Sequence, residues 1–315
     1  MLQNGGSSDD EPLEDTTAAI PLHSKRTERK QRKRATRDHK KSSATTLSQL
    51  PTELIVEVLK LLRPSDVFSF ANVDRRFRAL VHVNADNVGD EIIQRRYLIL
   101  TQCFPLPKLL ADIDPAMQQL LTDPARPRRL DIHKRPYQHV IPPNPQLVCT
   151  CLTCFLTWNN LGLVLDFAHW QNNLDLGVPI PTLPRGQTLE WNTRLVERSA
   201  RIVQRALGNS LRYARILEAH LDSTVRAIRR HQGNKGNKRM HVDMTDEEAA
   251  SGVDSFLQKA GPQSLEFPYN RDDYDLLEAY LPNRWWFKRD QKWVYTIARQ
   301  QHERDLDLLA NAPNR

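Results

Sequence analysis

Residues 47–83 read LSQLPTELIVEVLKLLRPSDVFSFANVDRRFRALVHV and contain three short helical signals in succession. After Pro51, apolar side chains recur at steps of three and four residues, which is the spacing of one helix face. Pro64 restarts the backbone and opens a second helix, because a first helical turn tolerates a residue without an N–H group. Asn72 or Asp74 can cap a third helix with apolar residues along one side. The segment therefore predicts a three-helix module.

The order of short motifs in this segment closely resembles the F-box. Leu-Pro-x-Glu-Leu begins at Leu50, Pro-x-Asp at Pro64, and Val-x-Arg-x-Phe-Arg at Val73. F-box modules are helical docking units, so the resemblance implies binding to the Skp adaptor, which connects to a cullin scaffold and a RING subunit. The chain would then be the substrate receptor of an SCF ubiquitin ligase, and it would act by proximity. Two alternatives are an F-box scaffold or nuclear regulator outside the ligase, and a nucleic-acid-binding protein.

The resemblance also implies which residues face the adaptor. The motif positions that family members use against it correspond to Leu50, Pro51, Leu54, Ile55, Val58 and Leu59. The positions that join the helices or complete the contact correspond to Phe70, Val73, Phe77 and Leu80. Periodicity alone also fits a purely structural three-helix core. A unit of about forty residues is too small to bury all these side chains by itself, so some must contact a partner or the rest of the chain.

The basic excess of the chain belongs largely to one short segment. Of the formal net charge of +7, residues 1–24 contribute −5 and residues 25–41 contribute +8. We expect residues 1–45 to form a disordered tail, because they show no apolar periodicity. A cluster resembling a nuclear import signal comprises Lys25, Arg26, Arg29, Lys30, Arg32, Lys33 and Arg34. The cluster would also suit a nucleic-acid-binding arm or a solubilising tail, and the expected location is the nucleus, the cytoplasm or both.

Composition argues against several classes of protein. No stretch approaches the roughly eighteen apolar residues of a membrane span, so we expect no membrane partner. The first residues are acidic and lack the apolar region of a signal peptide, which argues against secretion. The sequence contains no phosphate-binding glycine loop, His-Glu-x-x-His or Gly-x-Ser-x-Gly motif. We therefore predict that the chain is not an enzyme.

We predict a mainly α fold, in which an N-terminal three-helix F-box module precedes an irregular, largely helical C-terminal domain. The module with one following helix spans 46–100, and a proline-rich connector spans 101–146. The region 147–310 is expected to be a helical domain that binds an unidentified protein substrate. Low hydropathy and alternating charge predict a flexible insertion over 231–252.

Within the C-terminal domain, residues 147–170 are apolar enough to form a buried helix. Apolar residues over 190–231 follow helical spacing, and Gly208 is expected to break this region into two helices or to kink it. For residues 265–310 we expect two helices that are separated near Pro282.

Aromatic and basic residues are interleaved near the C-terminus. They are Trp285, Trp286, Phe287, Lys288, Arg289, Lys292 and Trp293. An exposed surface of this kind stacks bases and neutralises phosphates. We instead expect Trp286 and Trp293 to be core residues at helical spacing, because large aromatic side chains are costly to expose.

Three of the four cysteines lie close together in the sequence, at Cys149, Cys151 and Cys154. Cys-x-x-Cys is an ordinary spacing for zinc ligands, and zinc requires four ligands in a tetrahedron. The fourth ligand would have to come through folding from Cys103, His133, His139 or His169. Alternatively, these cysteines are small buried apolar residues without a metal. We expect this second case, and therefore no cofactor, and keep zinc as the other interpretation.

Overall fold

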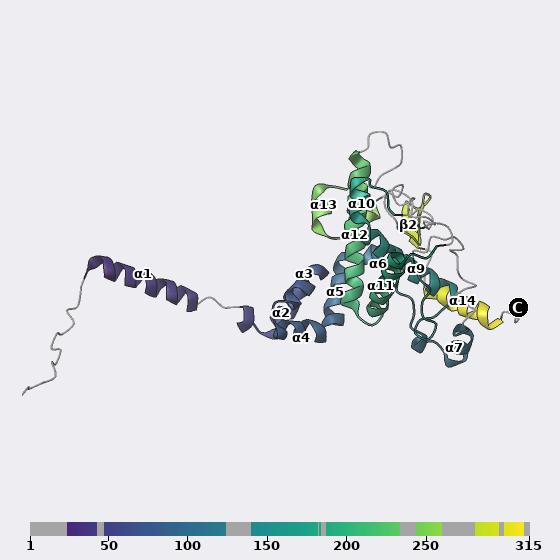
Figure 1. Ribbon diagram of the computed structural model, residues 1–315, viewed down its shortest axis with the longest axis horizontal. Coiled ribbons are helices and arrows are strands. Elements are labelled where there is room, and N and C mark those ends of the chain that lie inside the picture. The colour runs from purple at the N-terminus through teal and green to yellow at the C-terminus, as the bar shows by residue number, and fades with distance from the viewer. Residues whose placement is uncertain are drawn as a thin grey trace, which may run out of the picture. The chain divides into compact units, whose positions relative to one another are not determined.

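The computed structural model describes residues 24–42, 47–123, 140–181, 183, 187–233, 244–259, 281–295 and 299–311. The chain divides into two compact units, Met1–Pro51 and Thr52–Arg315. The prediction of a mainly α fold is confirmed for these described residues (Figure 1). None of their helices is both long enough and apolar enough to cross a membrane.

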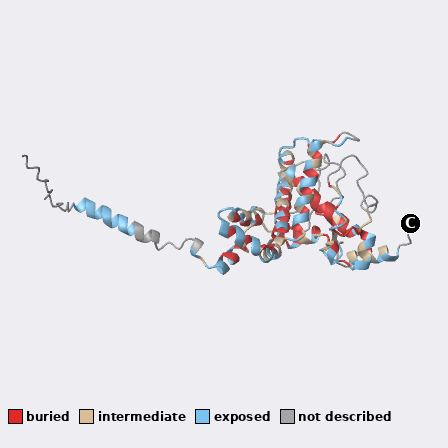
Figure 2. Ribbon diagram, turned by 60° about the horizontal axis from the view of Figure 1, so that its bottom comes forward, coloured by how far each residue is buried: buried red, intermediate tan, exposed pale blue. Residues whose placement is uncertain are grey.

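The first unit contains a helix where we predicted none. Helix α1 (Lys25–Ser42) covers the basic segment, and a short 3-10 helix, η1 (Leu47–Gln49), follows it. The expectation of a disordered tail over 1–45 is therefore wrong for α1. The segment lacks glycine and proline and is rich in Lys and Arg, which favour helix even without packing. All side chains that are described in α1 are exposed (Figure 2). Residues 1–23 lie outside the described residues.

The second unit begins with the three short helices that the sequence predicts. They are α2 (Thr52–Leu59), α3 (Pro64–Ala71) and α4 (Arg75–Val83). Asp74 caps α4, because its carboxylate accepts a hydrogen bond from the Phe77 amide at 2.8 Å. The ring of Phe77 lies 4.3 Å from that of Phe70, which joins α4 to α3. The positions of the three helices and the Asp74 cap of α4 are thus as expected.

Helix α12 (Ser210–Gly233) lies at the centre of the second unit and contacts α3, α5, α6, α9, α10 and α11 (Figure 1). Helices α5 (Ala85–Arg96) and α6 (Leu98–Cys103) follow α4, whereas we expected a single helix there. Helix α9 (Leu152–His169) is buried along most of its length, as predicted. Helix α11 (Glu190–Ala206) ends just before Gly208, so the predicted break is confirmed.

Several segments that we expected to be irregular contain short helices. Within the predicted connector 101–146 lie η2 (Leu110–Asp112) and α7 (Pro115–Leu121), and residues 124–139 lie outside the described residues. The predicted insertion 231–252 contains the end of α12 and helix α13 (Asp246–Ser251), which begins with a Thr245–Glu248 capping box. Residues 234–243 are not among the described residues. Helix α10 (Gln171–Leu176) and η3 (Ser255–Gln258) complete the helices of this part.

The prediction of a helix directly after Pro282 is wrong, and the helix predicted before it falls on residues 260–280, which lie outside the described residues. Strands β1 (Arg284–Phe287) and β2 (Lys292–Tyr295) form an antiparallel hairpin that pairs Trp286 with Trp293. Aromatic and β-branched side chains favour strands, and Gln291 in the turn adopts a positive φ of 50°. A single helix, α14 (Arg299–Asn311), follows the hairpin.

Candidate metal centre and candidate docking face

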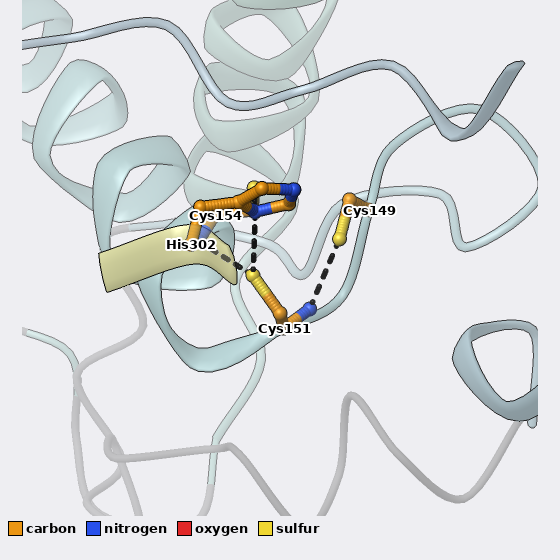
Figure 3. Close-up of side chains that lie close together, drawn as sticks. All are labelled: Cys149, Cys151, Cys154 and His302. Carbon is orange, nitrogen blue, oxygen red and sulfur yellow. Dashed lines mark hydrogen bonds between the residues drawn. The ribbon is translucent and has the colours of Figure 1, made fainter. Parts of the chain in front are cut away.

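Three cysteines and one histidine converge at the start of α9. Cys149 and Cys151 precede this helix, Cys154 lies in its first turn, and His302 lies in the first turn of α14. The three sulfur atoms and a ring nitrogen of His302 all lie within 4.8 Å of one another. Figure 3 shows the four side chains directed toward a common centre. Among the described residues, this is the group of His, Cys, Asp and Glu side chains that could hold a metal ion.

The spacing of the donor atoms fits a tetrahedral metal ion. His302 Nδ1 lies 3.3 Å from Cys151 Sγ and 3.4 Å from Cys154 Sγ. In a tetrahedral zinc site the bond lengths place neighbouring donor atoms about 3.5 to 3.8 Å apart. The four atoms therefore need only small side-chain rotations to surround a single ion.

The backbone around the site fixes Cys149 and Cys151. An isolated bridge between Leu109 and Val148 aligns the two segments, and the Cys149 amide donates to the Lys108 carbonyl at 3.0 Å. Cys151 is the N-cap of α9, and its sulfur accepts a hydrogen bond from the Cys154 amide at 3.4 Å. The positive end of the helix dipole therefore faces the sulfur atom of Cys151.

Backbone amides also contact the other two sulfur atoms. The Lys108 amide lies 3.4 Å from Cys154 Sγ, and the Cys151 amide lies 3.5 Å from Cys149 Sγ. Such N–H···S hydrogen bonds orient metal-binding thiolates and offset part of their charge. Each sulfur of the cluster thus has an amide donor aimed at it.

Helix α14 is attached beside the cluster by a buried carboxylate. Asp305 lies three residues after His302, and its side chain accepts a hydrogen bond from the Thr153 amide at 2.6 Å. Leu306 and Leu309 pack against the apolar residues that surround the cysteines. One face of α14 therefore holds both the histidine and the contacts that position it.

The protein environment alone favours protonated thiols at the site. Hydrogen bonding to Cys149 is the main cause that raises the pKa of Cys154, and Cys151 and burial raise it further. The neighbouring Cys149 is also the main cause of the raised pKa of Cys151. Several thiolates held this close together repel one another in a buried site. A bound cation would reverse this balance, because it pairs with the thiolate charges.

The structure corrects our candidates for the fourth ligand. Cys103 lies elsewhere, where its carbonyl accepts from Asn283 Nδ2 at 2.7 Å, and burial raises the pKa of its thiol to about 12. His169 is at the opposite end of the 18-residue helix α9, roughly 25 Å from Cys151 at the usual rise per residue. His133 and His139 lie outside the described residues. His302 was missed because it is 148 residues from Cys154 in the sequence. The apolar residues Leu306 and Leu309 give its helix one side that packs against the core, and this spacing was the available signal.

The residues expected to face the adaptor divide into buried and exposed sets. Ile55, Leu59 and Phe77 are buried, and Phe70 and Leu80 are half-buried, so these five hold the helices together. Leu50 is half-buried and Pro51 is exposed, and both belong to the first unit. Val73 is exposed.

One apolar stripe remains open to solvent along α2 and just beyond it. Leu54, Val58 and Leu61 are 54%, 49% and 55% exposed, and their spacing of four and three residues places them on one helix side. We call these three residues the α2 stripe. They are a candidate docking face.

The basic residues of the import-like cluster and the tryptophans near the C-terminus lie in elements that the sequence did not predict. All seven residues of the import-like cluster are exposed on α1. Trp286 and Trp293 are half-buried and face each other across the hairpin, with ring centroids 5.2 Å apart, so helical spacing is the wrong explanation for them. Trp285 lies on the opposite face of the strand and is exposed.

Comparisons with known proteins identify no relative. No family model matches the chain, and no match was found among the curated proteins or the solved structures.

Proposed function

We propose that this chain is a non-catalytic F-box substrate receptor that binds the Skp adaptor and recruits a protein substrate to a cullin–RING ubiquitin ligase. The observation that carries the proposal is the α2 stripe, which lies within the segment that has the F-box motif order. On the opposite side of α2, Ile55 and Leu59 are buried, so this side already packs against the rest of the fold. An exposed second apolar side fits a helix that also contacts a partner.

A pull-down of the adaptor and the cullin tests this proposal. Leu54→Glu/Val58→Glu places two charges on the docking face without changing a buried residue, so adaptor capture should fall by about tenfold or more. Leu176→Glu/Val178→Glu is the matched control, because it charges two exposed apolar residues beside α10. Equal capture by both variants would refute the docking face. Capture of the adaptor without the cullin would favour the scaffold alternative.

We further propose that the cluster of Cys149, Cys151, Cys154 and His302 binds zinc. Three sulfur donors and one imidazole form a common set for structural zinc, and softer thiolate ligands disfavour magnesium and calcium. Four protein ligands leave no position for a reacting water, so the ion would stabilise the fold rather than catalyse a reaction. Bound zinc would hold α14 against the start of α9.

Elemental analysis of the purified protein tests the zinc site. The wild-type chain should contain about one zinc ion, and both Cys151→Ser and His302→Ala should lose it. Cys103→Ala is the control, because this buried cysteine lies outside the cluster. Full metal content in His302→Ala would contradict the assignment of the fourth ligand.

The exposed basic residues of α1 support a second proposal, nuclear import or binding of nucleic acid. An exposed helix that is rich in cations attracts phosphate backbones without reading their sequence. Replacing Arg32, Lys33 and Arg34 by alanine should shift a fluorescent fusion toward the cytoplasm if the segment is an import signal. Salt-sensitive retention on nucleic acid that the same variant loses would instead favour the binding arm.

A further inference from the structure

Four helices of the second unit surround an open cavity of about 400 Å³. Helix α3 contributes Phe68, α9 contributes Leu165 and Ala168, α11 contributes Ile202, and α12 contributes Ile216 and Ala219. These side chains form an apolar floor that belongs to neither the metal centre nor the α2 stripe. The volume is within the range of cavities that hold small ligands or one or two large side chains.

Three arginines line the same cavity: Arg205 on α11, and Arg212 and Arg215 on α12. All three are exposed. Within the part of the chain that the structure describes, the guanidinium groups of Arg205 and Arg212 have no acidic or hydrogen-bonding partner. Two permanent positive charges therefore border an apolar surface without local compensation.

Of the three arginines on this rim, Glu218 pairs with Arg215. Its buried carboxylate lies 3.3 Å from Arg215, and it also accepts hydrogen bonds from the Ser65 amide at 2.9 Å and the Ser65 hydroxyl at 2.6 Å. Both oxygen atoms of the carboxylate thus already accept hydrogen bonds at the start of α3. Glu218 is also not among the residues that line the cavity. No acidic side chain is among the described residues that line it.

We propose that this cavity binds an acidic peptide segment of a partner protein. An apolar side chain of the peptide occupies the floor, and flanking carboxylates pair with Arg205 and Arg212. Guanidinium groups suit this role, because they bind carboxylates through two parallel hydrogen bonds and keep their charge at any physiological pH. The inference deepens the proposed receptor function, since the peptide would be the recognition segment of the substrate.

Fluorescence anisotropy with a labelled probe peptide, Glu-Asp-Glu-Leu-Phe-Glu-Asp-Glu, tests this proposal on the full chain. Arg205→Ala/Arg212→Ala should weaken binding by about tenfold or more. The matched control is Arg198→Ala/Arg201→Ala, which removes two exposed charges from α11 and should bind like wild type. Ala168→Trp fills the cavity without changing charge and should also abolish binding. Equal affinity in all four proteins, or equal losses in both arginine variants, would overturn the proposal.

Two further probes define the class of ligand. A peptide with Ser-Ser in place of Leu-Phe should bind at least about tenfold more weakly, because the apolar floor would gain no contact. Displacement of the peptide from the cavity by millimolar inorganic phosphate or by single-stranded DNA would overturn the peptide assignment in favour of a phosphate ligand.

Adaptor capture by the same variants separates this inference from the proposed function. Arg205→Ala/Arg212→Ala should still capture the adaptor, because neither arginine lies on the α2 stripe. Peptide binding by a wild-type chain that fails to capture the adaptor would support the cavity and refute the receptor function. Adaptor capture without any peptide binding would refute the cavity alone.

Discussion

Asp254 is a buried carboxylate that receives two backbone amides. Its Oδ2 accepts hydrogen bonds from the amides of Ile99 and Leu100, both at 2.8 Å, and so caps the start of α6. Burial outweighs these bonds and raises the pKa of Asp254 from 3.8 to about 6. The folded protein therefore holds this proton more tightly than the unfolded chain does.

The Asp254 shift predicts a pH-dependent stability. Because its pKa is higher in the folded state, the contribution is fully present below about pH 4 and falls by up to about 3 kcal/mol as the pH rises through 6. Asp254→Asn, which retains an oxygen acceptor, should remove this part of the pH dependence. Urea unfolding of both proteins between pH 4 and 7 measures the difference. A constant difference across this range would contradict the prediction.

Gly89 allows α5 and α12 to approach closely. A Cβ atom at this position would lie 2.2 Å from the Leu211 amide nitrogen, which belongs to backbone and cannot rotate away. Gly89→Ala should therefore lower the free energy of unfolding by about 3 kcal/mol, as overpacking does elsewhere. Gly208→Ala is the control, because a Cβ there meets nothing within 4 Å. Thermal unfolding curves compare the two, and similar Tm values would rule out the steric explanation.

Helix α14 carries His302 to the cysteines, so the contacts that position this helix also position the proposed zinc ligand. The Asp305 carboxylate joins it to the Thr153 amide one turn from His302. Asp305→Ala should lower zinc affinity by about 10- to 100-fold, because the histidine would lose its orientation. Competition with a chromophoric chelator measures this change. Asp307→Ala, at an exposed site on the same helix, should leave the affinity unaltered.

The helices were easier to predict than the elements made by distant residues. Regular apolar spacing and the Asp74 cap act within a few residues, so α2, α3 and α4 could be placed from the sequence. The hairpin at Trp286 was assigned as helix, because its four-residue strands are too short to show a clear alternation. His302 joins the cysteines only through the fold, and the cysteine spacing could not identify it.

At the scale of the second unit, the proposed docking helices are continuous with the rest of the fold. Glu218 ties the start of α3 to α12 through two hydrogen bonds from Ser65, and the Asp86 carboxylate accepts one from the Ser210 amide at 2.8 Å. Helices α2 to α5 and the C-terminal helices thus share one compact unit.

Loss of the Glu218 carboxylate should loosen this connection. Glu218→Ala leaves the partly buried amide and hydroxyl of Ser65 without their acceptor, so the free energy of unfolding should fall by about 3 kcal/mol. Hydrogen exchange should then accelerate in α3, while the amides of α9 keep their protection. Glu197→Ala, at an exposed position on α11, provides the comparison. Unchanged exchange in α3 would show that apolar packing alone holds it.

The length of α12 has a consequence for where a bound peptide would be presented. Its 24 residues span about 36 Å, and the same rod carries the Glu218 anchor of α3 and two arginines of the cavity. If the chain is the proposed receptor, a protein bound in the cavity would be held at a fixed distance from the ligase scaffold, because no hinge separates these points of α12. The position of each lysine on the bound protein would then decide whether it is modified. Only lysines that come close to the ubiquitin thioester at that fixed distance could accept ubiquitin.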